Sequence, residues 1–429
     1  MTDTEATADV DLADVPRCPF AHEQPYDPMS AAAAENAEPW LQQARTEAPI
    51  FYHAPLDLYI FTRHSDIMAV LRDTRSFSSR YTNKFKPMES PVLQAAFPDG
   101  HPGLRAMTLS DPPVHTRIRR LANVALTPKA VAATEPGMRR RCNQLIDAIV
   151  ADGEADLMGQ FSSPMTVLMI TDLAGLPESL DLDLHQWAQD YFALNLGAPA
   201  LTDEQERAIA ERATRMMAFL TEFVAERRAR PREDVISGLI HARTPEGDTA
   251  LSNVEVIGVL NSLLVAGVET TAIFVPMFLR LLLRHPRQWR EVVADRSLLP
   301  AAIEEGLRYQ PTARGVRRTA TREVEIGGVR IPEGKDIFLT YVSANFDADI
   351  FGEPERFDIH RSRSDRHLTF GKGTHFCIGA PLARLQSRVA VETVIDRLPN
   401  LRLVDDEIEW RPHMTLPRPA HVRFAWDVR

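Results

Sequence analysis

The sequence predicts a mainly α-helical protein with a smaller β-rich part in its last third. Apolar residues keep helical spacing almost throughout from Lys129 to about Arg243. Ser252-Asn-Val-Glu255 then forms a capping box that opens a long apolar helix. Beyond that helix, Val324 to Ile331 alternates apolar and polar residues about a Gly-Gly pair, which is typical of a β-hairpin. No internal repeat or linker interrupts the pattern, so one mixed domain is expected.

The N-terminal part is expected to be loosely organised at first. Residues 1–35 are rich in alanine and acidic residues without a clear period, and we expect a loose leader followed by a single domain from 36 to 429. Leu58 to Thr62 predicts a strand. Ser65 to Arg72 predicts a helix that is capped by Ser65 or Asp66. Ser76 to Ser110 is interrupted by Pro, Gly and Ser and predicts a long loop with one short helix. A loop of this length inside a compact domain is usually functional.

Later elements follow from similar signals. Asp111-Pro112-Pro113 predicts the start of a helix, with its Asp as the N-cap. Leu299 to Tyr309 predicts a helix, Ile337 to Val342 a strand and Ile378 to Leu398 another helix. The residues from 343 to 376 are rich in Asp, Gly, Pro and Phe and predict an irregular segment. A short alternating strand is expected at the C-terminus.

Composition limits the class of protein. The 429 residues are 44% hydrophobic and 25% charged, as in an ordinary globular protein. The formal net charge of -10 argues against nucleic acid as a main partner, because phosphate binding needs a concentrated basic surface. Three cysteines spread along the chain suit a reducing compartment. The segment from Met1 to Arg17 lacks the features of a secretory signal, so a cytoplasmic location is expected.

The long apolar stretch from Val254 to Leu283 is expected to be a helix buried in protein. A carboxylate at the centre of a bilayer costs several kcal/mol, which argues against a membrane span. Pro276 is expected to kink or end this helix. The polar residues near its middle, which need a separate explanation, are Asn261, Glu269, Thr270 and Thr271.

The most informative segment is Phe370-Gly-Lys-Gly-Thr-His-Phe-Cys377-Ile-Gly-Ala-Pro-Leu-Ala-Arg384. Three glycines surround one cysteine, and glycine lets a backbone turn tightly or lie flat against a bulky planar group. A large ligand is therefore implied. Cys377 also lies where a helix begins, with Pro381 in the first turn, so unpaired amides and the helix dipole would stabilise a thiolate.

Two other interpretations of Cys377 remain open at this point. A lone cysteine is more often a small buried hydrophobic residue than a ligand. A zinc site would recruit His367, His375 and Cys377, but it would lack the second closely spaced cysteine pair of structural zinc sites.

The cysteine segment resembles the haem-binding loop of the cytochrome P450 family, Phe-Gly-x-Gly-x-His-x-Cys-x-Gly followed by Leu-Ala-Arg, at every specified position. Four further patterns are similar and occur in the family's order, so the resemblance covers about residues 35 to 425. It implies the cytochrome P450 fold, with haem b between a long distal helix and a proximal helix that follows the iron ligand, Cys377. By the same resemblance Phe370, Gly371 and Gly379 are cofactor-binding residues of the loop.

The second pattern, Ala266-Gly267-Val-Glu269-Thr270-Thr271, resembles the family's oxygen-activation motif. The resemblance implies that Ala266 and Gly267 lie beside the cofactor, where Gly267 leaves room near the iron. Thr270 would hydrogen-bond the bound dioxygen or its water, and Glu269 would relay protons. Many relatives have Asp in place of Glu269, so the longer side chain is expected to hold its relay partners differently. The alternative is that the threonines only bond to carbonyls one turn earlier.

The third pattern, Glu305-Gly-Leu-Arg308, resembles the family's buried ion pair, which braces the core behind the haem. Spacing alone is a weak signal, because Glu353 and Arg356 are spaced in the same way and most such pairs are solvated. In a fourth pattern around Ser343 to Asp347, relatives have Arg where this chain has Phe346. Part of the ion-pair network there is therefore in doubt.

The fifth pattern concerns the two haem propionates, which need cationic partners. His115 and Arg119 are four residues apart and share one helix face. The resemblance assigns them this task together with Arg318 and His375, whereas the alternative is a basic surface helix. Arg314 is considered as a partner of a substrate carboxylate.

The resemblance implies a haem-thiolate monooxygenase that inserts one atom of O2 into a small organic substrate, by hydroxylation or oxidative dealkylation. Electrons from NAD(P)H are expected through a separate ferredoxin and ferredoxin reductase. The protein is expected to be a monomer without a membrane or nucleic acid partner. The alternatives are a peroxide-using peroxygenase, whose relatives usually lack the acid and alcohol pair, and a haem-thiolate binding or sensor protein. A basic patch for the ferredoxin is predicted from Lys372, Arg117, Arg120, Lys129 and Arg388.

The substrate is not determined by the sequence. By resemblance, its pocket is lined by the loop from Tyr81 to Met107, the stretch from Tyr191 to Leu201, Leu263, Ala266, the segment from Thr312 to Val316 and the segment from Met414 to Leu416.

Overall fold

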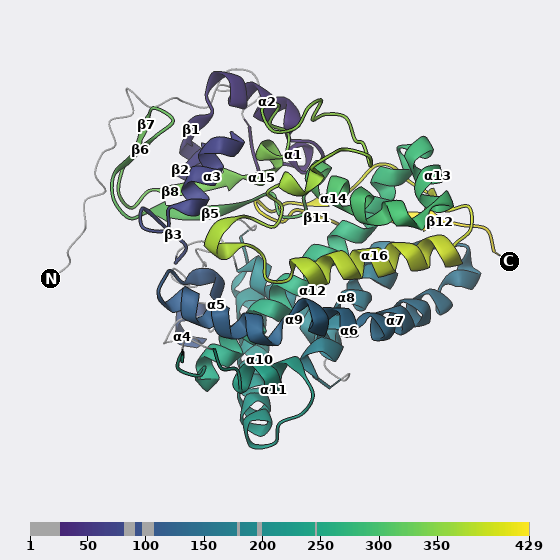
Figure 1. Cartoon of the computed structure of the whole chain (residues 1–429), viewed down its shortest axis with the longest axis horizontal. Helices are drawn as coiled ribbons and strands as arrows, with labels where there is room; N and C mark the ends of the chain where they lie inside the picture. The colour runs from purple at the N-terminus through teal and green to yellow at the C-terminus, as the bar shows by residue number, and fades with distance from the viewer. Residues whose placement is uncertain are drawn as a thin grey trace.

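A computed structural model describes residues 26–80, 91–96, 107–177, 181–194, 200–244 and 247–428. The fold is mainly helical with small sheets, which confirms the predicted class. Figure 1 shows the largest sheet at one side of the molecule and the long helices filling the rest.

The helices account for most of the described chain. Their bounds are α1 Ala31–Glu35, α2 Glu38–Glu47, α3 His64–Arg72, α4 Pro91–Ala96, α5 Val114–Ala125, α6 Pro128–Ala133, α7 Glu135–Asp147, α8 Ser163–Ala174, α9 Asp181–Ala193, α10 Asp203–Ala229, α11 Val235–Ile240, α12 Asn253–Leu283, α13 Pro286–Ala294, α14 Leu299–Tyr309, α15 Tyr341–Ala344 and α16 Ala380–Arg397.

The strands form one five-stranded sheet and three small ones. The large sheet has the order β1-β2-β8-β5-β3, in which only β2 and β8 run parallel. The predicted Gly-Gly hairpin is confirmed as β6 and β7. The bounds are β1 Ile50–His53, β2 Leu58–Phe61, β3 Phe77–Ser78, β4 Glu154–Asp156, β5 Gly315–Ala320, β6 Val324–Ile326, β7 Val329–Ile331, β8 Asp336–Thr340, β9 Arg402–Leu403, β10 Trp410–Arg411, β11 Arg418–Pro419 and β12 Arg423–Ala425.

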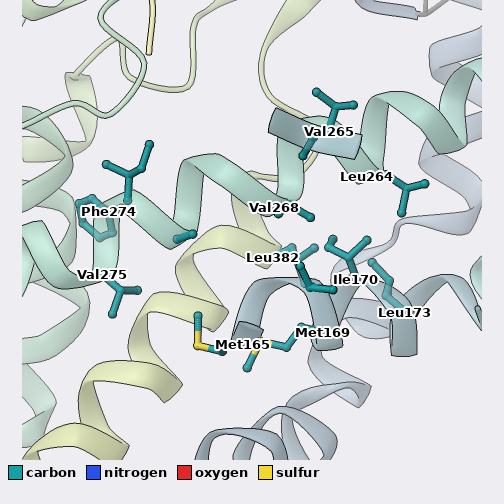
Figure 2. Close-up of a cluster of buried hydrophobic side chains, with 14 of the residues drawn as sticks. Met165, Met169, Ile170, Leu173, Leu264, Val265, Val268, Phe274, Val275 and Leu382 are labelled. Carbon is teal, nitrogen blue, oxygen red and sulfur yellow. The ribbon is translucent and has the colours of Figure 1, made fainter. Parts of the chain in front are cut away.

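The core is built around α12, which packs against both α8 and α16 (Figure 2). The capping box predicted at its start is confirmed, with Ser252 and Glu255 each bonding the other's backbone. In the described part of the chain, α12 alone is long and apolar enough to cross a membrane, but 72% of its most apolar stretch is buried inside the protein. The side chains that meet in this core are Met165, Met169, Ile170 and Leu173 of α8, Leu264, Val265, Val268, Phe274 and Val275 of α12 and Leu382 of α16.

α12 does not end at Pro276, because it continues to Leu283; a local bend at this proline stays a prediction. Proline lacks an amide hydrogen, so the carbonyl of Ala272, four residues earlier, loses its helical partner. The hydroxyl of Ser162 donates to that carbonyl oxygen at 2.7 Å. A neighbouring element therefore satisfies the group that the proline leaves open.

The expected loose leader is wrong for its described part. Tyr26 is buried, and α1 packs against the body of the protein through Ala33 and Ala34. Arg280 of α12 donates to Glu35 at 2.9 Å. Residues 1–25 lie outside the described range.

Two predicted helix starts are also corrected. α3 begins at His64, and its first amide donates to the carboxylate of Asp347 at 2.9 Å rather than to a local Ser or Asp. α5 begins at Val114, after Pro113, and the Asp111 side chain is no N-cap. That carboxylate instead accepts from Ser78 Oγ at 2.6 Å. The first amide of α3 and the carboxylate of Asp111 therefore both bond to residues distant in sequence and not to the neighbouring residues that capping would use.

Candidate functional site

The cysteine loop leads into α16 through tight backbone contacts. The amide of Cys377 donates to the carbonyl of Phe370 at 2.8 Å, which closes the loop on itself. Burial raises the pKa of the Cys377 thiol, whereas the amides of Gly379 and Ala380 and the charge of Arg119 oppose that rise. The sulfur is therefore held in a pocket of donors at the start of a helix. A coordinated metal ion would complete the removal of its proton, because coordinating thiols are deprotonated.

Two glycines of this loop differ in how strictly they are required. Gly373 has φ +71°, and a Cβ there would lie 2.6 Å from the carbonyl oxygen of Leu71, at the end of α3. Gly379 has an ordinary φ, but its Cβ would point at the sulfur of Cys377, 3.8 Å away. Gly373 is therefore required for the loop to pack against α3, whereas a Cβ at Gly379 would make only an ordinary contact with the sulfur.

Phe370 is held by the ion pair behind it. The guanidinium of Arg384 lies 4.7 Å from the centre of the Phe370 ring and donates to Glu304 at 2.5 and 2.9 Å. Burial opposes ionisation of Glu304, but hydrogen bonds from Arg384 and His367 outweigh it and lower the pKa of Glu304 to about 2. This contact also accounts for His367, which the zinc interpretation needed as a ligand. Among the described residues, no group of three His, Cys, Asp or Glu side chains could hold a metal ion.

The four residues expected at the propionates share one buried region. The rings of His115 and His375 lie 4.0 Å apart, and their nitrogens His115 Nδ1, His115 Nε2 and His375 Nε2 have no hydrogen-bond partner in the described structure. Burial and the nearby charges of Arg119 and Arg318 lower the pKa of His115 to about 4 and that of His375 to about 3. Arg119 also donates to the carbonyl of Phe376 beside Cys377, at 2.7 Å. Such a region fits a ligand with two carboxylates.

The predicted oxygen-activation motif lies on α12, most of whose residues are buried. Ala266 is exposed in the middle of this helix although Val265 beside it is buried, so there is space against this face. The hydroxyl of Thr270 donates to the carbonyl of Ala266 at 2.7 Å. The back-bond considered as the alternative is therefore present, and it leaves the oxygen of Thr270 as an acceptor.

Glu269 is buried and incompletely paired. Its side chain is 3% exposed, and burial raises its pKa while the charges of Arg418 and Arg411 oppose that rise. Oε2 lies 3.5 Å from Arg418 Nη1, and Oε1 lies 3.7 Å from Nδ1 of His185 on α9. Sequence reasoning did not find His185 or Arg418, because no local motif connects them to α12.

Gly267 has a packing role in addition to the expected one. A Cβ at this position would lie 2.7 Å from Cδ1 of Ile170, on α8. The glycine therefore allows α12 to approach α8, and its expected place beside the haem stays a prediction.

The Glu305–Arg308 pair is fully buried and lies in a network. Arg308 donates to both carboxylate oxygens at 2.8 Å, and Glu305 also accepts from Arg361 and Ser364, each at 3.0 Å. The ring of Phe346 lies 5.3 Å from the Arg308 guanidinium. A cation–π contact is thus present at the position where relatives have arginine, and the network around Glu305 is intact.

Arg314 is used by the fold. Its guanidinium donates to the carbonyls of Ala33 and Ala34 at the end of α1. Burial lowers the pKa of Arg314 to about 10. The substrate role considered for it is therefore not supported. Most of the expected pocket loop, residues 81–90 and 97–106, and residues 195–199 lie outside the described range.

The predicted basic patch is largely neutralised. Arg117 pairs with Glu255, Arg120 with Asp248, and Arg388 with Glu135 and Glu392. Lys372 lines a cleft of about 480 Å³ between α3 and the cysteine loop. Arg72 and Arg366 line the same cleft.

Comparison with known proteins agrees with this arrangement. The sequence profile of the cytochrome P450 family matches residues 50–408. The chain is 33% identical to 6-deoxyerythronolide B hydroxylase of Saccharopolyspora erythraea, over 86% of this chain and 91% of the relative. It is also 33% identical to cyclomarin C epoxidase of Salinispora arenicola, over 90% and 95%. The crystal structure of the Tepidiphilus thermophilus P450 haem domain superposes with a TM-score of 0.87 at 29% identity, covering 94% of this chain and 96% of the other.

The fold and the site together define a haem-dependent oxidoreductase. The chain belongs to the cytochrome P450 family, whose members bind haem b, and it is a P450 monooxygenase. The residues present fit that cofactor: the unpartnered imidazoles beside Arg119 and Arg318 suit its two carboxylates, and the sulfur of Cys377 lies in the same region.

Proposed function

We propose that Cys377 is the thiolate ligand of the haem iron and that the protein oxidises a small organic substrate with O2. The observation that carries this proposal is the buried cluster of His115, His375, Arg119 and Arg318 beside the cysteine loop, in which three imidazole nitrogens have no hydrogen-bond partner among the described residues. His115 and Arg119 of α5, Arg318 of β5 and His375 would hold the propionates. The amides that follow Cys377 would stabilise its negative charge.

The bound haem supplies the oxidising chemistry, and a thiolate ligand favours cleavage of the O–O bond. The chain itself positions the reactants and delivers protons. Thr270 has a fixed hydroxyl hydrogen, so its oxygen can accept a hydrogen bond from a water or from the oxidant. Glu269 directly precedes Thr270 in the sequence, and its carboxylate is buried. It can therefore hold the next proton for transfer.

The acid and alcohol pair also favours this function over the two alternatives. A peroxygenase receives its protons with the peroxide, and a sensor does not turn over O2, so neither needs a buried acid with cationic neighbours beside Thr270. Insertion of one oxygen atom by hydroxylation or oxidative dealkylation is therefore proposed. The names of the similar proteins, a hydroxylase and an epoxidase, support oxidation at carbon.

We further propose that electrons from NAD(P)H arrive through a separate ferredoxin and its reductase. We also propose that the protein is a monomer in the cytoplasm and has no membrane or nucleic acid partner. The burial of α12 inside the protein supports the proposal that it does not bind a membrane.

The test is the absorption difference spectrum of the reduced, carbon monoxide-treated protein. The wild type should give the strongly red-shifted Soret band of a thiolate-ligated haem, and Cys377→Ala should lose it. Cys142→Ala is the matched control, because Cys142 is buried in α7 and should leave the band unchanged. A band typical of neutral histidine ligation in the wild type would refute the ligand assignment, and absence of haem would refute the function.

A further inference from the structure

The buried acid Glu269 lies beside an imidazole on another helix. His185 of α9 is 28% exposed, whereas Glu269 is 3% exposed, so the two side chains span from solvent to the interior. Nδ1 of His185 lies 3.7 Å from Oε1 of Glu269, and neither atom has a hydrogen-bond partner in the described structure. A small rotation of either side chain would bring them into hydrogen-bond contact.

The other ring nitrogen of His185 is already engaged. Nε2 lies 2.7 Å from the amide nitrogen of Gln189, one turn later on α9. An amide nitrogen only donates, so Nε2 accepts, and the neutral ring carries its hydrogen on Nδ1. With the side-chain amide of Gln189 placed in this way, the ring hydrogen points towards Glu269.

The charges around this pair favour proton transfer between its members. Arg418 of β11 lies 3.5 Å from the other oxygen of Glu269, and Arg411 of β10 also acts on this acid. Burial and Arg418 lower the pKa of His185 to about 4, whereas burial raises the pKa of Glu269. The imidazolium of His185 is therefore a stronger acid than usual and the Glu269 carboxylate a stronger base, so both shifts favour transfer from the protonated ring to Glu269.

We propose that His185 is a positioning residue for proton supply, which directs its Nδ1 hydrogen at Glu269 and connects this buried acid to solvent. The inference rests on the proposed role of Glu269. In each cycle the Gln189 amide turns away, a proton from water binds Nε2, and the Nδ1 proton of the resulting imidazolium passes to Oε1, so Glu269 becomes the neutral acid. Release of the Nε2 proton to water and return of a proton from water to Nδ1 restore the starting tautomer and charge of His185.

The first test observes the ring directly by ¹⁵N NMR of the reduced, carbon monoxide-bound holoprotein. His185→Gln identifies the resonances. We expect Nδ1 to be protonated near neutral pH, and we expect Glu269→Gln to shift it. Arg418→Met should raise the pKa of His185, because Arg418 lowers it. A ring with its hydrogen on Nε2 that does not respond to Glu269→Gln would overturn the proposal.

The second test measures O2 uptake driven by NADH, ferredoxin and reductase in water and in heavy water. His185→Gln should slow uptake by about tenfold and should increase the solvent isotope effect. The expected loss is smaller than the roughly 100-fold or more that is typical of a group that transfers a proton to the reacting atom itself. The double variant with Glu269→Gln should be no slower than Glu269→Gln alone. His360→Gln is the matched control, because His360 is exposed and pairs with Glu291 on the surface.

The two proposals can fail separately. Loss of the red-shifted carbon monoxide band in the wild type would refute the proposed function. An intact band with uptake and isotope effect unchanged in His185→Gln would refute only the role of His185.

Discussion

At the scale of single residues, the network around Glu305 shows how a buried charge is tolerated in this protein. An unpaired buried carboxylate would cost several kcal/mol, but Glu305 accepts from Arg308, Arg361 and Ser364. Arg308 in turn donates to the carbonyl of Asn345 at 2.9 Å. The pair therefore connects α14 to the irregular segment that precedes the cysteine loop.

Glu305→Gln should lower the free energy of unfolding by about 3–5 kcal/mol, because it leaves Arg308 buried without its carboxylate. Glu353→Gln is a matched control, since Glu353 and Arg356 have the same spacing but are 77% and 62% exposed. That change should cost less than about 1 kcal/mol. Urea unfolding of both variants measures the difference, and equal losses would show that burial does not decide the strength of these pairs.

This comparison also shows what sequence could predict for single residues. The spacing of Glu305 and Arg308 did not distinguish them from Glu353 and Arg356, and only the resemblance selected the buried pair. The contact of Phe346 with Arg308 could not be predicted, because a cation–π contact has no spacing rule along the chain. His185 was missed because its approach to Glu269 from another helix also has no spacing rule along the chain.

At the scale of elements, signals local in sequence were predictable and signals that depend on packing were not. The capping box of α12 is complete within four consecutive residues and was predicted correctly. The start of α3 depends on Asp347, which is distant in sequence, and was placed incorrectly. The contact of Gly267 with Ile170 of α8 could not be predicted, because the distance between α12 and α8 is set by side chains of both helices.

The bond from Ser162 to α12 leads to a prediction about that helix. Ser162→Ala should lower the free energy of unfolding by about 1–3 kcal/mol, because the carbonyl of Ala272 becomes a buried acceptor without a donor. Pro276→Ala should restore an amide donor for that carbonyl, so Ser162→Ala should cost much less in that background.

Ser163→Ala provides the control for this prediction. Ser163 is the next residue and is also buried, but its hydroxyl has no hydrogen-bond partner in the described structure. Its removal should leave stability unchanged or raise it. A double-mutant cycle measured by urea unfolding gives the coupling between Ser162 and Pro276, and a coupling near zero would show that another group satisfies Ala272.

At the scale of the whole molecule, sequence determined the balance of charge but not which charges remain free. The net charge is -10, yet cations gather near the cysteine loop. Arg117, Arg120 and Arg388 were expected to form the docking patch, but acidic residues from other elements pair with them. These ion pairs join residues that no sequence pattern connects. The packing of residues 26–35 against the core likewise depends on residues distant in sequence.

Lys372 remains from the predicted patch, and it lies with Arg72 and Arg366 at the cleft beside Gly373. We expect this cleft to receive the proposed ferredoxin. Arg72, Arg366 and Lys372 form no ion pair within the described residues, and the apolar residues Met68 and Ile350 also line the cleft. A local basic patch on an acidic protein accelerates encounter with an acidic partner, and salt screens this effect.

Arg72→Glu combined with Lys372→Glu should slow ferredoxin-supported reduction by about tenfold or more at low ionic strength, and the difference should shrink as salt is added. Arg287→Glu combined with Arg330→Glu changes the net charge equally at residues that are 87% and 74% exposed on other elements. Stopped-flow reduction under carbon monoxide measures both double variants. If the two slow reduction equally, overall charge governs the encounter; if neither does, the cleft is not the docking surface.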